Sequence, residues 1–136
     1  MWLDGVDNGR RLVEVFGNDA VPSIESVYLM EVKLQEDGPQ LQLRFDLKTF
    51  PSQPPADWVA KKANMVQVTL MLGQLRLVEI HGFGRENHVR MTLQNEGGVF
   101  RLGVVGTATK IRAEAGMAVI PKVSPYLRDP PLRMAP

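Results

Sequence analysis

The chain has 136 residues, of which 44% are hydrophobic and 23% charged, and its formal net charge is +1. These values are typical of one globular domain that buries its own hydrophobic core. They exclude the strong overall attraction to nucleic acid that a basic protein has, and the absence of cysteine excludes disulfides and thiolate metal sites.

The chain begins with MWLDGVDNGRR, which has two acidic residues before its first arginine and no apolar run typical of a signal peptide. No window approaches the run of about eighteen apolar residues that a membrane-spanning helix needs. We therefore expect a cytoplasmic protein that does not interact with a membrane.

Charge is distributed unevenly along the chain. Residues 1–26 hold five acids and two bases, a local charge of −3, whereas residues 101–136 hold six bases and two acids, a local charge of +4. This asymmetry would either steer a charged partner or reflect ordinary solvated surfaces.

A short helix is predicted over Asn8–Phe16. Either Asp7 or Asn8 would cap its N-terminus, and Gly17 would adopt the left-handed conformation after its last turn. A helix of about nine residues depends on the rest of the fold for its stability.

From residue 27 onward the hydrophobic period changes to two, which is typical of strands with one buried and one solvated face. Residues 28–35 and 41–48 both alternate in this way. The Glu36–Pro39 turn between them contains Asp-Gly, which predicts a hairpin. The apolar face of the second strand comprises Leu41, Leu43, Phe45 and Leu47, and the solvated face Gln42, Arg44, Asp46 and Lys48.

Residues 50–62 interrupt the alternation with three prolines and form a long loop around Trp58, which either packs against the domain or has a function. Alternation resumes in Val66–Leu72 and, after Gly73, in Leu75–Ile80. The later predicted strands are His88–Gln94, Phe100–Val104, a short one at Ile111 and Met117–Val123.

Six to eight short strands with one leading helix predict a mainly β fold, a single antiparallel β-sandwich or barrel-like domain. We assign residues 1–123 to this β-rich domain and residues 124–136 to a proline-rich C-terminal arm. Long alternating edge strands would also allow a homodimer.

The segment Gly82–Asn87 joins two predicted strands, and we call it the joint. We expect Gly82 and Gly84 to supply the positive φ angles of a turn and Phe83 to anchor the turn in the core. The joint is not a phosphate-binding loop, because it lacks a third glycine and a following helix.

Residues that could support catalysis or metal binding are not arranged for either. His81 and His88 flank the joint near Glu79 and Glu86, but no further ligand has the spacing of a zinc or iron site. No carboxylate pair is predicted to lie in a cleft, and no serine lies in a nucleophile elbow. We therefore expect no enzyme activity, no metal and no cofactor.

Nucleic acid is not an expected partner either. Outside the predicted helix, Lys61-Lys62 is the only adjacent basic pair, and aromatic residues make up 7% of the chain. Binding would need a basic stripe interleaved with aromatic side chains.

Two motifs point to a family. Phe16-Gly17 is followed by Pro22-Ser23-Ile24 ahead of the first strand, and Gly82-Phe83 and Asn87 stand in the joint. These motifs resemble the immunity protein 50 family, the predicted antidotes of bacterial polymorphic toxin systems. Its members have a short helix ending in Phe-Gly, then Pro-Ser-Phe-His-Asp-Ala-Glu-Val, and later Gly-Phe-Asn-x-Gln-Asn. The similarity extends over roughly residues 12–123.

The chain departs from the family pattern at polar positions of both motifs, and Ile24 stands where the family has the aromatic residue. Glu25, Ser26 and Tyr28 stand where the family has His, Asp and Glu. Gly84 and Glu86 stand where it has Asn and Gln. The polar triad that precedes and begins the first strand is therefore rewritten in this chain.

The resemblance implies a non-catalytic protein that binds and neutralises a cognate toxin protein. It does not imply which residues make the contact. We nominate large or charged residues at joints and loops, namely Glu25, Tyr28, Trp58, Arg85 and Glu86. The alternatives are a small β-barrel carrier of an apolar small molecule and an accessory domain without its own activity.

Overall fold

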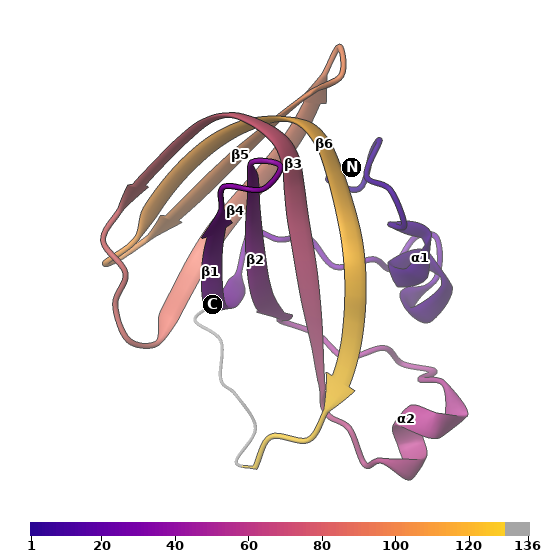
Figure 1. The fold of residues 1–136 in the computed structure, drawn as a ribbon. Coiled ribbons are helices and arrows are strands. Elements are labelled where there is room, and N and C mark those ends of the chain that lie inside the picture. The colour runs from indigo at the N-terminus through magenta and orange to yellow at the C-terminus, as the bar shows by residue number, and fades with distance from the viewer. Residues whose placement is uncertain (130–136) are drawn as a thin grey trace.

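The structure, a computed structural model, describes residues 1–129. Six antiparallel strands form a closed barrel in the order β1-β2-β3-β6-β5-β4 (Figure 1). The predicted mainly β fold is thus confirmed, and of the two architectures considered it is the barrel. The elements are α1 Arg10–Phe16, β1 Val27–Gln35, β2 Gln40–Leu47, α2 Ala56–Ala60, β3 Met65–His81, β4 Asn87–Glu96, β5 Val99–Gly106 and β6 Lys110–Tyr126.

The predicted hairpin of β1 and β2 is confirmed, and it closes with Gln35 paired to Gln40. A register shift between Leu29 and Glu31 interrupts the pairing. Such a bulge adds one residue to a strand and changes which side chains face inward after it. Met30 is exposed as a result, although it belongs to the apolar alternation of the sequence.

Strands β3 and β6 are each longer than the sequence predicts. β3 continues through Gly73, where the sequence predicts two separate strands, and β6 likewise contains two predicted strands. Gly73 is paired with Met117, and a Cβ atom on Gly73 would lie 2.7 Å from the Met117 side chain. Both strands curve over the barrel together in Figure 1. The glycine therefore marks a close approach within a bent strand and not its end.

The segment before α1 pairs with the edge of β6 that β5 leaves free beyond Ala115. The Asp7 amide donates to the Ala118 carbonyl over 2.9 Å, and the Asp7 carbonyl accepts from the Ile120 amide over 2.9 Å. The Asn8 side chain donates to the Ile120 carbonyl over 2.7 Å. These contacts hold α1 beside the barrel, where its Leu12 is fully buried.

The predicted N-terminal cap of α1 is wrong, and at the C-terminus Gly17 has the predicted positive φ but, with ψ 157°, not the left-handed helical conformation. Gly9 occupies the N-cap position, and no side chain caps the helix. Asn8 is not available as a cap because its side chain is bonded to β6. Gly17 follows the helix with φ 94°, and its amide bonds to the Val13 carbonyl.

The barrel interior is a packed hydrophobic core. The apolar alternation predicted for β2 and β4 corresponds to the buried faces of both strands. The same core extends under α1 and the N-terminal segment. Its largest fully buried side chains are Leu12, Val27, Leu29, Leu41, Leu43, Phe45, Leu47, Val66, Leu70, Leu72, Met91 and Ile120.

The long loop before β3 packs against the domain through Trp58, one of the two roles that the sequence left open. It contains the single turn of α2, and Trp58 on this turn is only 7% exposed. The Trp58 ring lies 6.0 Å from that of Phe50, measured between centroids.

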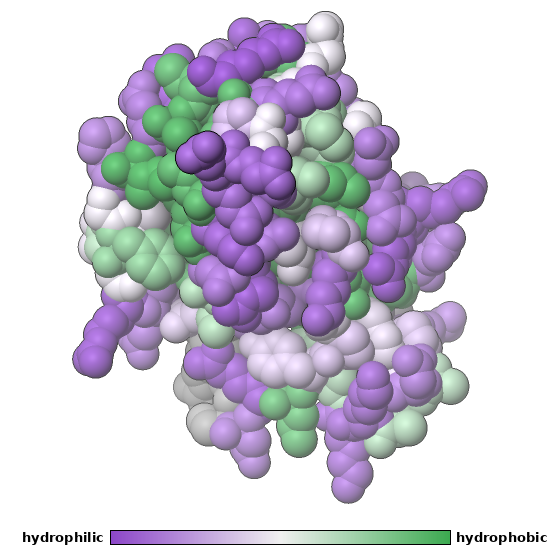
Figure 2. Space-filling model, in the orientation of Figure 1, coloured by the Kyte–Doolittle hydropathy of each residue, from purple (hydrophilic) through white to green (hydrophobic). Residues whose placement is uncertain are grey.

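The predicted C-terminal arm is partly strand. β6 extends to Tyr126 and so includes the first three residues assigned to the arm, and residues 130–136 lie outside the described residues. Within residues 1–129, no helix is long and apolar enough to cross a membrane. Hydrophilic side chains cover much of the face in Figure 2, with hydrophobic surface between them.

Candidate functional site

The joint is not a hairpin turn, because β3 and β4 are not neighbours in the barrel. It passes over the turn between β5 and β6 instead. A Cβ atom on Gly82 would lie 2.1 Å from the Ala108 carbonyl oxygen, and one on Gly84 would lie 2.8 Å from the Ala108 Cβ. Gly82 has the predicted positive φ, 74°, but the other positive φ in the joint belongs to Glu86 and not to Gly84. Glycine is therefore required at position 84 because a side chain there would collide with Ala108.

Asn87 fixes the conformation of the joint. Its side-chain oxygen accepts a hydrogen bond from the Gly84 amide over 3.0 Å, and its side-chain nitrogen donates to the Gly84 carbonyl over 2.8 Å. The hydroxyl of the buried Thr109 donates to the same oxygen over 3.1 Å. This member of the family motif therefore stabilises the fold.

The prediction that Phe83 anchors the joint in the core is wrong, since its side chain is 51% exposed. The joint lies over the outside of the β5–β6 turn, so a side chain in its middle does not reach the barrel interior. Arg85 and Glu86 are exposed as well. The joint thus presents one aromatic ring and two opposite charges to solvent.

The joint leads directly into β4, whose pairing with β1 is the shortest strand pairing in the barrel. Strands β1 and β4 share three residue pairs, and we call this pairing the β1–β4 seam: Val27 with Val89, Tyr28 with His88, and Leu29 with Asn87. Every other pair of neighbouring strands shares more residues. The seam is therefore the least extensively hydrogen-bonded line of the barrel.

An aromatic and cationic cluster lies along the seam. The Tyr28 and His88 rings pack edge to face, with centroids 5.0 Å apart and an interplanar angle of 82°. The Arg128 guanidinium carbon lies 5.4 Å from the Tyr28 ring centroid, within cation–π range. Nδ1 of His88 is buried and has no hydrogen-bond partner among the described residues. Local sequence carries no sign of these contacts, because the three residues are far apart along the chain.

A buried carboxylate lies beside this cluster. Asp46 is fully buried and accepts hydrogen bonds from the Gln67 side chain, over 3.1 Å, and from the Tyr126 hydroxyl. Burial, together with the hydrogen bond and charge of Asp46, raises the pKa of Tyr126 to about 12, although Arg128 opposes the shift. The prediction that Asp46 is solvated is wrong, because the C-terminal end of β6 covers it.

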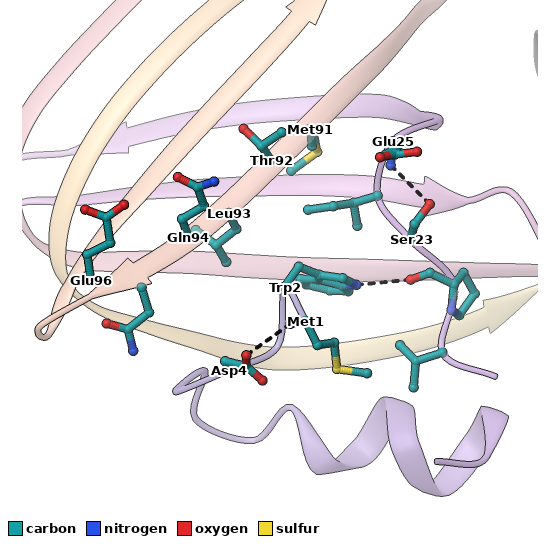
Figure 3. Close-up of a pocket in the computed structure, with 14 residues that line it drawn as sticks. Met1, Trp2, Asp4, Ser23, Glu25, Met91, Thr92, Leu93, Gln94 and Glu96 are labelled. Carbon is teal, nitrogen blue, oxygen red and sulfur yellow. Dashed lines mark hydrogen bonds and ion pairs between the residues drawn. The ribbon is translucent and has the colours of Figure 1, made fainter. Parts of the chain in front are cut away.

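A groove of about 630 Å³ opens beside the distal half of β4, and we call it the β4 groove (Figure 3). The Trp2 indole nitrogen donates to the Pro22 carbonyl over 3.0 Å and holds two walls of the groove together. The Met91 amide donates to the Ile24 carbonyl over 2.8 Å at its inner end. The groove is lined by Met1, Trp2, Asp4, residues 21–25 and residues 91–96.

The β4 groove is acidic. Asp4, Glu25 and Glu96 line it, and its lining contains no Lys, Arg or His. Asp4 pairs with the amino group of Met1 over 3.0 Å, and Glu96 pairs with Arg101 over 2.6 Å. The carboxylate of Glu25 has no cationic partner among the described residues.

Four of the five nominated residues follow the seam, and one does not. Tyr28 lies on the seam itself, Arg85 and Glu86 precede it on the joint, and Glu25 lies beyond its other end, in the β4 groove. Trp58 is buried on α2 and offers little surface to a partner. Sequence reasoning considered His88 only as a metal ligand and missed Arg128, and both become neighbours of Tyr28 only in the folded barrel.

Within residues 1–129, no group of three or more His, Cys, Asp or Glu side chains is placed to hold a metal ion. His81 is paired with Lys110 on β6, whereas His88 is paired with Tyr28 on β1, so the two histidines belong to different strand pairings.

The comparisons with known proteins identify the family. The model of the family described as immunity protein 50 matches residues 8–126, which include α1, the joint and all six strands. No curated protein and no solved structure matches the chain. The chain therefore belongs to the immunity protein 50 family.

Proposed function

We propose that this protein binds and neutralises one cognate bacterial toxin, without catalysis of its own. The observation that carries the proposal is the family match, which extends from the start of α1 to the end of β6. The matched range contains both helices and all six strands of the described residues. An immunity protein acts by forming a stoichiometric complex, so its surface must supply the specificity.

We place the contact surface along the β1–β4 seam, from the joint to the β4 groove. Exposed charges of both signs lie on the joint at Arg85 and Glu86, and the half-buried ring of Tyr28 lies between the joint and Glu25. Protein interfaces commonly combine an aromatic or arginine anchor with complementary charges around it. Trp58 contributes to this surface only by stabilising the fold.

The proposal includes a polymorphic toxin system and action in the bacterial cytoplasm. The family provides the link to toxin immunity. A chain without cysteine contains nothing that needs an oxidising compartment.

The packing of the barrel interior argues against the carrier alternative. A carrier would need an internal cavity for its ligand, of the size typical of ligand pockets. The side chains that face the barrel interior pack into one continuous hydrophobic cluster instead, as in other small barrels.

The test needs a neighbouring open reading frame that encodes a large secreted protein with a C-terminal toxin domain, and it uses that domain in purified form. We expect the two proteins to elute together at a one-to-one ratio, and we expect toxin activity to fall linearly until one equivalent is added. An unrelated small β-barrel is the control. Full toxin activity and separate elution at excess immunity protein would overturn the proposal.

A further inference from the structure

Strand β4 is paired along its whole length on one side and only in part on the other. β5 pairs with it from Val89 to Glu96, whereas β1 pairs with it only up to Val89. The Met91 amide then bonds to the Ile24 carbonyl, and beyond this point the chain of residues 21–23 forms the opposite wall of the β4 groove. The distal half of β4 is therefore an open strand edge.

The turn after β4 shows which backbone groups face this edge. Gly97 and Gly98 have φ angles of 59° and 84°, as in a two-residue hairpin turn of type I′. In such a turn the flanking pair, here Glu96 and Val99, is hydrogen-bonded. Since backbone direction alternates along a strand, the even-numbered residues of β4 bond to β5 and the odd-numbered residues face away.

The open edge thus belongs to Leu93 and Asn95. The Met91 amide bonds to Ile24 and not to β5, which agrees with the alternation. No described residue provides a hydrogen-bond partner for the backbone N–H or C=O groups of Leu93 and Asn95 toward the groove. In Figure 3, Met91 to Glu96 follow the β4 ribbon along one side of the groove, and Trp2, Ser23 and Glu25 lie on the other side.

We propose that the toxin adds a cationic extended segment to this edge as a further strand of the sheet. The inference rests on the proposed function and specifies where and how the toxin binds. Strand addition to an exposed edge is an established mode of peptide recognition, in which backbone bonds supply affinity and side-chain sites supply specificity. The charge of the segment follows from Glu25, which lines the groove and has no cationic partner among the described residues, whereas Asp4 pairs with the Met1 amino group and Glu96 with Arg101.

The first test removes one edge amide. Asn95→Pro deletes an N–H that makes no bond to β5, and Asn95→Ala is the matched control that loses only the side chain, including its bond to the Gly98 amide. Edge strands tolerate proline where the N–H faces outward. We expect affinity for the toxin domain to fall at least about tenfold for Asn95→Pro relative to Asn95→Ala, with thermal unfolding showing that both variants fold.

The second test reverses one charge and does not depend on the proline variant. Glu25→Lys places a cation in the β4 groove, and Glu36→Lys makes the same change in the turn between β1 and β2. We expect Glu25→Lys to slow association about tenfold and to weaken its dependence on salt, because charges at an interface act mainly on the association rate. Glu36→Lys should bind as the wild type does.

Hydrogen exchange of the Leu93 and Asn95 amides completes the test. These amides should exchange rapidly in the free protein and become protected in the toxin complex. A tight complex in which they still exchange rapidly would overturn strand addition, and one that Glu25→Lys leaves unchanged would overturn the cationic segment. Either result would leave the proposed function intact. Protection by a second copy of this chain would also overturn it, and no complex at all would overturn both proposals.

Discussion

The Thr109 hydroxyl donates a hydrogen bond to the Asn87 side chain over 3.1 Å and so ties the joint to the turn between β5 and β6. Asn87 also holds the joint closed through its two hydrogen bonds with Gly84. The side chain therefore connects three segments at the start of β4. The role of Asn87 in the family motif is therefore structural: it holds together the segments that close one end of the barrel.

Replacing Asn87 should destabilise the protein. We expect Asn87→Ala to lower the free energy of unfolding by about 2–4 kcal/mol, because it leaves the buried Thr109 hydroxyl and backbone groups of Gly84 without partners. Urea unfolding followed by circular dichroism measures the change. Asn18→Ala, at an exposed position, is the control and should change the free energy by less than about 0.5 kcal/mol. A loss as small as that of the control would contradict the role of Asn87.

Alanine substitutions at two glycines with positive φ, Gly82 and Gly97, distinguish the cost of backbone strain from the cost of a steric clash. Gly97→Ala should cost about 1–2 kcal/mol, because its φ is 59° but nothing lies within 4 Å of an added Cβ. Gly82→Ala should cost clearly more, because the added Cβ would also lie 2.1 Å from the Ala108 carbonyl oxygen. Thermal or urea unfolding of the two variants makes the comparison. Equal losses would show that the joint can move away from Ala108.

The raised pKa of Tyr126 predicts a pH dependence of stability. The unfolded chain loses the Tyr126 proton near pH 10, whereas the folded protein keeps it up to about pH 12. The folded state then binds more protons than the unfolded state, so the free energy of unfolding should fall as pH rises from 10 to 12. Urea unfolding at several pH values across this window measures the slope.

Tyr126→Phe is the control for this slope, because lysines and other tyrosines also titrate at high pH. The variant should be less stable than the wild type at pH 8, since Asp46 loses one of its two hydrogen bonds. Its stability should decline less steeply between pH 10 and 12. An identical decline in both proteins would mean that Tyr126 does not cause it.

Trp58 should act on stability and not on toxin binding. Trp58→Ala should lower the free energy of unfolding by about 3–5 kcal/mol, the usual cost of removing a buried tryptophan. Trp58→Phe keeps part of the packing against Phe50 and should remain folded at room temperature. Calorimetric titration of folded Trp58→Phe with the toxin domain should give the wild-type affinity. A tenfold weaker complex would instead place Trp58 in the interface.

Local patterns predicted most strands because alternation and turn residues depend on neighbours in sequence. These patterns predicted two strands where β3 is continuous, because a glycine in the sequence is equally typical of a turn and of a close approach between bent strands, as at Gly73. They did not predict barrel closure, since the seam pairs Val27 with Val89 across a long sequence separation. The choice between sandwich and barrel depends on that contact.

The loop residues Phe83 and Trp58 show that local sequence patterns also failed to predict which side chains of the site are exposed. Phe83 was expected in the core and is half exposed, whereas Trp58, which was nominated as a partner contact, is buried. In both loops the sequence shows that an aromatic side chain is present. Whether that side chain packs against the barrel or faces solvent depends on the path of the loop in the folded protein. Glu25 was correctly expected at the surface, yet its place in an acidic groove depends on β4.

Protection of cells from the toxin tests the central claim most directly. The toxin domain encoded beside this gene is induced in a bacterial host with the wild-type protein, with an empty vector, or with an unrelated immunity protein. The proposed function predicts growth only with the wild-type protein, at an expression level no lower than that of the toxin. Growth arrest in its presence, with both proteins folded and detectable in the same cells, would contradict the assignment as an immunity protein for that toxin.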